Sequence, residues 1–163
     1  MSEALHLFQC PARGEPMQEF EEVFAVENKG FQNCVHGRSG SSRQVLLMDV
    51  ETLEKFDIPA GRARENITTS GIKLDGLQLG QILRVGEAVL EVAKPCTPCH
   101  LMDDIRPGLK VELQGRRGLL CRVVEGGWIR RGDRIEVAAA DRAAREIQGD
   151  ATTGISEKVK SIS

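Results

Sequence analysis

Aromatic residues and long apolar runs are scarce in this sequence of 163 residues. Only 4% of the residues are aromatic and tyrosine is absent, so a buried core must consist mainly of Val, Leu and Ile. No stretch approaches the length of about 18 apolar residues that a membrane-spanning helix needs. The first ten residues, MSEALHLFQC, lack the basic and apolar segments of a secretory signal. These absences predict a globular, cytoplasmic protein without membrane contact.

An excess of charge is missing as well, because 22 Lys and Arg residues face 24 Asp and Glu residues, a net charge of −2. A near-neutral chain exerts no long-range attraction on nucleic acid, so an anion site has to come from a local basic cluster. Arg116–Arg117 and Arg130–Arg131 lie at predicted turns without interleaved aromatic residues, which indicates solvated turn charges. The cysteines number five, which favours free thiols over a disulfide framework in a reducing compartment.

Glycine and proline are plentiful, with 17 and 6 residues. Between them, seven short runs alternate or are rich in branched residues, and they predict strands at 4–10, 21–27, 43–49, 81–86, 88–94, 118–125 and 133–138. Gly86 and Glu87 predict a hairpin between two of these strands. Strands spaced in this way are typical of an all-β barrel or sandwich rather than of a βαβ repeat.

Helical patterns are few. One short helix is expected at 49–57, where Asp49 can act as the N-cap, and a polar helix is expected at 141–148. The sequence therefore predicts one mainly β domain over 1–140, followed by a polar helix and a flexible tail over 141–163.

The segment KPCTPCHLMDD, residues 94–104, has two residues between Cys96 and Cys99, and His100 follows directly. Three chemistries share this pattern: attachment of c-type haem, the redox dithiol of thioredoxins, and zinc ligation. Haem attachment normally needs export to an oxidising compartment. The dithiol needs a βαβ setting with its first cysteine at a helix N-terminus, and zinc needs further ligands. The sequence around these cysteines favours none of the three.

Two prolines distinguish these cysteines from the others. Pro95 and Pro98 fix the shape of what is expected to be a loop at the end of a strand. Thiols on such a loop can be exposed enough to react, whereas Cys10 and Cys121 lie in apolar runs and are expected to be buried. His100 either assists a thiol or hydrogen-bonds to the backbone, and the residues alone leave both interpretations open.

A polar segment upstream, GRARENITTSG at 61–71, is a candidate binding wall. In an extended chain every second side chain shares a face, and that face would carry Arg62, Arg64, Asn66 and Thr68. A guanidinium fork, an amide and a hydroxyl can together hold a phosphate or the edge of a heterocycle. Arg38 and Arg43 would add charge if the loop 36–43 folds nearby. The alternative is a solvated polar strand.

Three segments in this order, RQVLLMD, GRARENITTSGIKLDGLQLGQILRVGEAVLEVAKPCTPCH and GLLCRVVEGGWIRRGDRIEV, resemble the MOSC domain, the molybdenum cofactor sulfurase C-terminal domain. The resemblance runs from residue 5 to residue 137. It implies a strongly twisted β-barrel with a few short helices. It also implies a molybdenum cofactor (molybdopterin) binding protein that uses a pocket cysteine in sulfur transfer or in molybdenum-dependent redox chemistry, as a sulfur carrier or a reductase.

The resemblance also implies roles for individual residues. The family's thiol position falls on Cys99, which would ligate molybdenum or take up sulfur as a persulfide from a pyridoxal-phosphate-dependent cysteine desulfurase. Cys96 would resolve that persulfide as a disulfide, so the implied catalytic residues are Cys99, Cys96 and His100. The implied cofactor pocket comprises Arg43, Arg64, Asn66, Thr68, Thr69 and His36.

One departure from the family pattern concerns the string before RQV. Small relatives show G-D-x-H there, whereas this chain has Cys34 in place of the aspartate and retains His36. Cys34 would bring a third thiol to the pocket rim. The expected partners are a cysteine desulfurase, which would carry the pyridoxal phosphate, or a molybdoenzyme, and not nucleic acid or a membrane. The alternative function is a non-catalytic module that binds or stores a small anion or a pterin.

Overall fold

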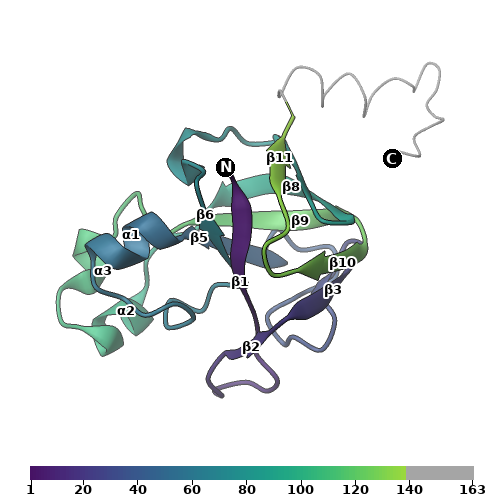
Figure 1. Ribbon diagram of the computed structural model, residues 1–163. Coiled ribbons are helices and arrows are strands. Elements are labelled where there is room, and N and C mark those ends of the chain that lie inside the picture. Colours follow the sequence, from purple (N-terminus) through teal and green to yellow (C-terminus); the bar gives the residue numbers. More distant parts are fainter. Residues whose placement is uncertain (139–163) are drawn as a thin grey trace.

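The computed structural model describes residues 1–138, and Figure 1 shows how their helices and strands are arranged. Within that range the strands are β1 (Glu3–Gln9), β2 (Gln18–Phe20), β3 (Glu22–Val26), β4 (Gly30–Phe31), β5 (Val45–Asp49), β6 (Ile67–Ser70), β7 (Ile82–Val85), β8 (Ala88–Pro95), β9 (Leu119–Glu125), β10 (Gly127–Arg130) and β11 (Ile135–Val137). The helices are α1 (Val50–Lys55), α2 (His100–Ile105), α3 (Leu109–Glu112) and a 3-10 turn, η1 (Leu74–Gly76). The predicted helix 141–148, the tail and the domain boundary at 140 lie outside the described residues.

Most strands belong to one sheet. Within residues 1–138 its eight strands follow the order β11-β7-β8-β9-β5-β6-β1-β2, while β10, β3 and β4 form a second sheet. Strands β5 and β6 run parallel, and the other neighbours in the large sheet are antiparallel. A single bridge between Glu3 and Arg134 brings β1 back to the segment before β11. The mainly β class with short helices is confirmed, and the expected barrel is a curled sheet that pairing does not fully close.

The seven predicted strands are all present, because each carries the alternating or branched pattern that suits a pleated, half-buried surface. The predicted hairpin joins β7 to β8, with Val85 paired to Ala88. Helix α1 begins after Asp49, whose carboxylate accepts a hydrogen bond from the Thr52 N–H at 3.1 Å. The strands that sequence reasoning missed are β2, β4 and β10, whereas β6 lies in the segment 61–71, for which a polar strand was one of the two interpretations.

Strand β5 separates two apolar clusters. Leu47 belongs to the main core between the strands, whereas the next residue, Met48, belongs to a cluster with residues of α1, α2 and α3. Successive side chains of a strand point to opposite faces, which explains this division. Figure 1 shows the three helices gathered at one side of the sheet. No helix within residues 1–138 combines the length and the hydropathy needed to cross a bilayer.

Candidate functional site

A cavity of about 310 Å³ brings together four segments that are distant in the sequence. They are the loop after β1, the loop that leads into β5, the residues before β6, and the stretch from the end of β8 into α2, with further residues from the start of β9. The lining residues are Arg13, Gly14, Val35, His36, Arg38, Arg43, Gln44, Val45, Leu46, Arg64, Asn66, Cys96, Thr97, Cys99, Leu101, Arg117 and Leu120. The expected loop 36–43 and the expected arginine–asparagine wall therefore meet the two cysteines.

Asn66 is the best-anchored polar residue of this wall. Its Oδ1 accepts a hydrogen bond from the Leu46 N–H at 2.9 Å, and its Nδ2 donates to the Phe8 carbonyl at 3.2 Å. The Nδ2 also donates to Cys34 Sγ at 3.5 Å. Both amide hydrogens are thus engaged, so Asn66 fixes the wall between β1 and β5 and leaves one Oδ1 lone pair free for a ligand.

Arg64 enters the cavity through a turn rather than an extended strand. Its φ of 66° lies in the left-handed region, and the chain is extended only from Ile67 onward. The expectation that Arg62 to Thr68 alternate on one face is therefore wrong, and Arg62 is exposed away from the cavity. The guanidinium of Arg64 is held by the Glu15 carbonyl, to which Nη1 donates at 3.0 Å.

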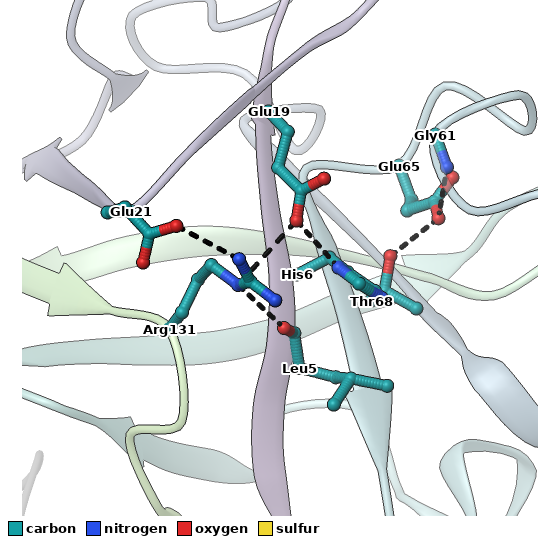
Figure 2. Close-up of polar contacts among 8 residues, drawn as sticks. All are labelled: Leu5, His6, Glu19, Glu21, Gly61, Glu65, Thr68 and Arg131. Carbon is teal, nitrogen blue, oxygen red and sulfur yellow. Dashed lines mark hydrogen bonds and ion pairs between the residues drawn. The ribbon is translucent and has the colours of Figure 1, made fainter.

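Thr68 and Thr69 are fully buried and do not line the cavity. The Thr68 hydroxyl donates to the Glu65 carboxylate at 2.6 Å, and the Gly61 N–H donates to the same oxygen at 2.9 Å (Figure 2). Thr68 therefore holds the turn that carries Arg64, and the contacts place neither threonine at the ligand position that the resemblance implies.

The two thiols of the C-x-x-C segment differ in environment. Cys99 is partly exposed and is the N-cap residue of α2, whereas Cys96 is only 8% exposed and its N–H donates to the Gly118 carbonyl at 2.9 Å. Burial raises the pKa of the Cys96 thiol, and the positive charges of Arg117 and Arg43 oppose that rise. Cys99 is therefore the more accessible nucleophile or ligand. In contrast to the thioredoxin arrangement, it is the second cysteine that begins the helix.

His100 and Cys34 lie outside the cavity lining. His100 is exposed at the first position of α2. Cys34 is buried, and its sulfur accepts the Cys10 N–H at 3.3 Å, so it sits behind Asn66 and is not a third thiol at the rim. Within residues 1–138 no group of three or more His, Cys, Asp or Glu side chains is arranged to hold a metal ion, so the zinc interpretation finds no ligand set there.

Sequence reasoning missed several cavity residues, among them Arg13, Gln44 and Arg117. The expectation of a solvated turn charge is wrong, because Arg117 is only 4% exposed. Its Nη2 donates to the Ala63 carbonyl at 2.6 Å and its Nη1 contacts Met48 Sδ at 3.7 Å, while Nε has no partner within residues 1–138. The only available signal was its position directly before Gly118 and a buried strand.

The cavity is strongly positive. Five of its lining residues are arginines, and no lining residue within 1–138 is an aspartate or a glutamate. None of these arginines has a carboxylate oxygen within 4.0 Å among the residues described. Burial lowers the pKa of His36, and the charges of Arg64 and Arg13 lower it further, so His36 is neutral at pH 7. The arrangement suits an anion held next to a soft sulfur ligand.

A family model for the MOSC domain matches residues 38–136, which is more than half of the chain. The chain belongs to the MOSC domain family. The matched range includes both cysteines of the cavity and the wall formed by Arg64 and Asn66. The MOSC domain is associated with molybdenum cofactor binding and sulfurase-type function.

Individual relatives are more distant. An uncharacterised protein of Bacillus subtilis, YflK, is 28% identical over 88 residues, which are 52% of this MOSC chain and 40% of that relative. The YUAD protein from the same species has a solved structure with a TM-score of 0.71 at 18% identity, covering 84% of this chain and 96% of YUAD. The solved structure of YiiM from Geobacillus stearothermophilus has a TM-score of 0.68 at 19% identity, and the match covers 85% of this chain and 76% of YiiM. At these identities the two structures establish the fold alone.

Proposed function

We propose that this MOSC domain binds the molybdenum cofactor in the 310 Å³ cavity and that Cys99 is the protein's ligand to molybdenum. The observation that carries the proposal is the joint lining of one cavity by the partly exposed Cys99 thiol and by the wall of Arg64 and Asn66. These residues are about 35 positions apart in the sequence, so their meeting is a property of the fold.

The donor set fits such a cofactor. The volume lies at the lower end of the range of about 300–1,000 Å³ that is usual for small-molecule sites. A thiolate is a soft ligand that suits molybdenum, and guanidinium forks bind phosphate oxygens in pairs. The unpartnered Nε of the buried Arg117 and the absence of carboxylates from the lining within residues 1–138 both favour an anionic occupant. When bound, the cofactor supplies a redox-active metal.

The chain's own residues would share the work as follows. Arg64, already oriented by the Glu15 carbonyl, binds the phosphate together with Arg43. Asn66 keeps the wall in place, and its free Oδ1 lone pair accepts one ligand hydrogen bond. His36, neutral because of burial and of its arginine neighbours, can either donate or accept one hydrogen bond within the same cavity.

Loading of the full chain with cofactor released from a molybdoenzyme tests this proposal. We expect equimolar molybdenum and pterin in the wild type, measured by mass spectrometry of the metal and by pterin fluorescence after oxidation. Cys99→Ala is expected to keep the pterin and lose the molybdenum. Cys121→Ala is the matched control, because Cys121 is fully buried in β9 outside the cavity, with a pKa raised to about 12 by burial. Full molybdenum loading of Cys99→Ala would refute Cys99 as the molybdenum ligand. The remaining function would then be that of a non-catalytic binding or storage module.

The second thiol of the cavity favours sulfur transfer as a second candidate function. The Cys99 thiolate would attack the outer sulfur of a partner desulfurase's persulfide, break its S–S bond and release the partner's thiolate. Cys96, which lines the same cavity, would then attack Cys99 Sγ, form a disulfide and release hydrosulfide. The sulfane sulfur is thereby reduced and the two thiols are oxidised. The pyridoxal phosphate of this reaction belongs to the partner.

Intact mass after incubation with a cysteine desulfurase and cysteine tests this second candidate. We expect a gain of one sulfur atom that a reductant removes and that Cys99→Ala lacks. Cys96→Ala is expected to accumulate the adduct, because the resolving thiol is gone. An adduct that persists in Cys99→Ala would exclude Cys99 as the sulfur acceptor.

A further inference from the structure

A second cavity, of about 710 Å³, lies beside the first. It is bounded by α1, by the segment 71–77 that follows β6, and by the segment 115–119 that leads into β9. Cys96 and Arg117 line both cavities and form the wall between them. The function proposed above gives this second cavity no role.

The exposed cations of the second cavity form no ion pairs with the residues that the structure describes. Lys55, Lys73 and Arg116 line it, and among the residues described none of them has a carboxylate oxygen within 4.0 Å. The Lys55 ammonium and the Arg116 guanidinium each lie 5.9 Å from the centroid of the Phe56 ring, so both cations contact the same aromatic ring. Charges that the protein does not neutralise are available to a ligand.

Two of the three carboxylates of the cavity lining accept hydrogen bonds from the protein. Asp49 accepts both the N–H and the hydroxyl of Thr52, at 3.1 and 2.6 Å, as the cap of α1. Glu51 accepts the Gly71 N–H at 2.9 Å. Asp75 is the remaining acidic residue of the lining, which also contains three exposed cations and the buried Arg117. With four cations and three carboxylates, the lining carries a formal net charge of +1.

Arg117 adds a buried charge to this wall. Its guanidinium is 4% exposed, its Nε–H lacks a partner within residues 1–138, and its strongest contact is with the neutral carbonyl of Ala63. An uncompensated buried charge costs free energy that a nearby anion offsets. The lining also has an apolar part, which includes Ile72, Leu77 and Leu119.

We propose that the second cavity binds a small organic carboxylate with an apolar body. The carboxylate would lie between Arg116 and Lys73, and the apolar body would cover Ile72 and Leu119. Because Cys96 forms part of the shared wall, the ligand shields the Cys96 thiol and leaves Cys99 accessible from the first cavity. This site requires no cofactor, so it stands apart from the proposed function.

Calorimetric titration of the full chain with sodium octanoate tests the site, with octylammonium chloride and 1-octanol as probes of equal chain length. We expect saturable octanoate binding, and binding of the cation and the alcohol that is weaker by roughly tenfold or more, as a few charge-assisted hydrogen bonds produce. Alkylation with iodoacetamide, followed by mass spectrometry of the peptides, should show slower labelling of Cys96 with octanoate and unchanged labelling of Cys99. Equal binding of 1-octanol would indicate apolar adsorption and overturn the proposal, as would no binding of octanoate.

Variants locate the bound carboxylate. The double variant Lys73→Glu with Arg116→Glu is expected to weaken octanoate binding by roughly tenfold or more, because both side chains line only the second cavity. Lys110→Glu, an exposed residue of α3 outside both cavities, is the matched control and should leave binding unchanged. Arg43→Glu, which lines only the first cavity, should also leave it unchanged. Loss of binding in Arg43→Glu with retention in the double variant would place octanoate in the first cavity and refute the site.

Discussion

Arginines occupy two contrasting environments in this MOSC domain. On the face formed by β1, β2 and β10, the Arg131 guanidinium contacts the carboxylates of Glu21 and Glu19 at 2.9 and 3.6 Å (Figure 2). The Glu19 carboxylate also accepts a hydrogen bond from His6 Nδ1 at 2.7 Å. The five arginines of the first cavity have no such partner within residues 1–138. The same side chain is neutralised by the protein where it joins strands and is left uncompensated where a ligand is expected.

The largest effect on this contrast should come from Asn66→Ala. The change removes the amide that joins β1 to β5 and leaves the Leu46 N–H and the Phe8 carbonyl without their partner. We expect the free energy of unfolding to fall by about 2–4 kcal/mol, measured by urea titration. Gln114→Ala, an exposed amide, is the control. A loss below about 1 kcal/mol would mean that the wall does not depend on this residue.

The two environments should differ next in anion binding. Arg64→Gln and Arg117→Gln are each expected to weaken the binding of inorganic phosphate by roughly tenfold or more, because each removes a charge-assisted donor. Calorimetry at low ionic strength measures the affinity. Arg131→Gln is the matched control and should leave it unchanged, since its guanidinium already binds Glu21 and Glu19. Equal weakening in all three variants would mean that the contrast has no consequence for ligands.

The pKa of His36 reports on the cavity charge. Because the folded protein lowers this pKa below the ordinary value of 6.5, the unfolded chain binds more protons between the two values. The associated stability is present above pH 6.5 and is lost as the pH falls through the lowered folded pKa. Arg64→Gln should raise the pKa of His36 and weaken this pH dependence, as followed by NMR titration of the imidazole and by unfolding at several pH values. A fall of the pKa would contradict the stated role of Arg64.

The smallest effect is expected on the neutralised face. Arg131→Gln should change the free energy of unfolding by less than about 1 kcal/mol, because its ion pairs are exposed to solvent. The difference between wild type and variant should shrink further in about 1 M salt, which screens such pairs. A large change in the free energy of unfolding that persists in salt would show that these ion pairs contribute substantially to stability.

The sequence predicted the strands whose apolar residues follow an alternating or branched pattern. The longer strands alternate or are rich in branched residues, and Asp49 lies where an N-cap belongs, so these elements were readable. Strands such as β4, with two residues, exist only because of their pairing with β3. The bridge between Glu3 and Arg134, which brings β1 back toward β11, likewise depends on contacts between distant residues.

The residue types of the site could be predicted from the sequence, whereas their arrangement in space could not. Cys99, Arg64 and Asn66 were identified because their residue types match the chemistry, and the fold places all three at one cavity. The left-handed turn at Arg64 has no sequence signal, since a residue other than glycine rarely adopts a positive φ. Arg117 was missed because arginine beside glycine usually indicates a solvated turn, and only packing against Met48 and Ala63 buries it.

The backbone contacts between the first residues and the segment 132–135 have a practical consequence. The Ala4 N–H donates to the Asp133 carbonyl at 2.8 Å and the Ile135 N–H donates to the Ser2 carbonyl at 2.9 Å, so the start of β1 covers groups that would otherwise be an open strand edge. Removing residues 1–4 would uncover that edge to other copies of the chain, and unpaired edges are templates for self-association. An expression tag fused tightly to the first strand is therefore expected to disturb this pairing.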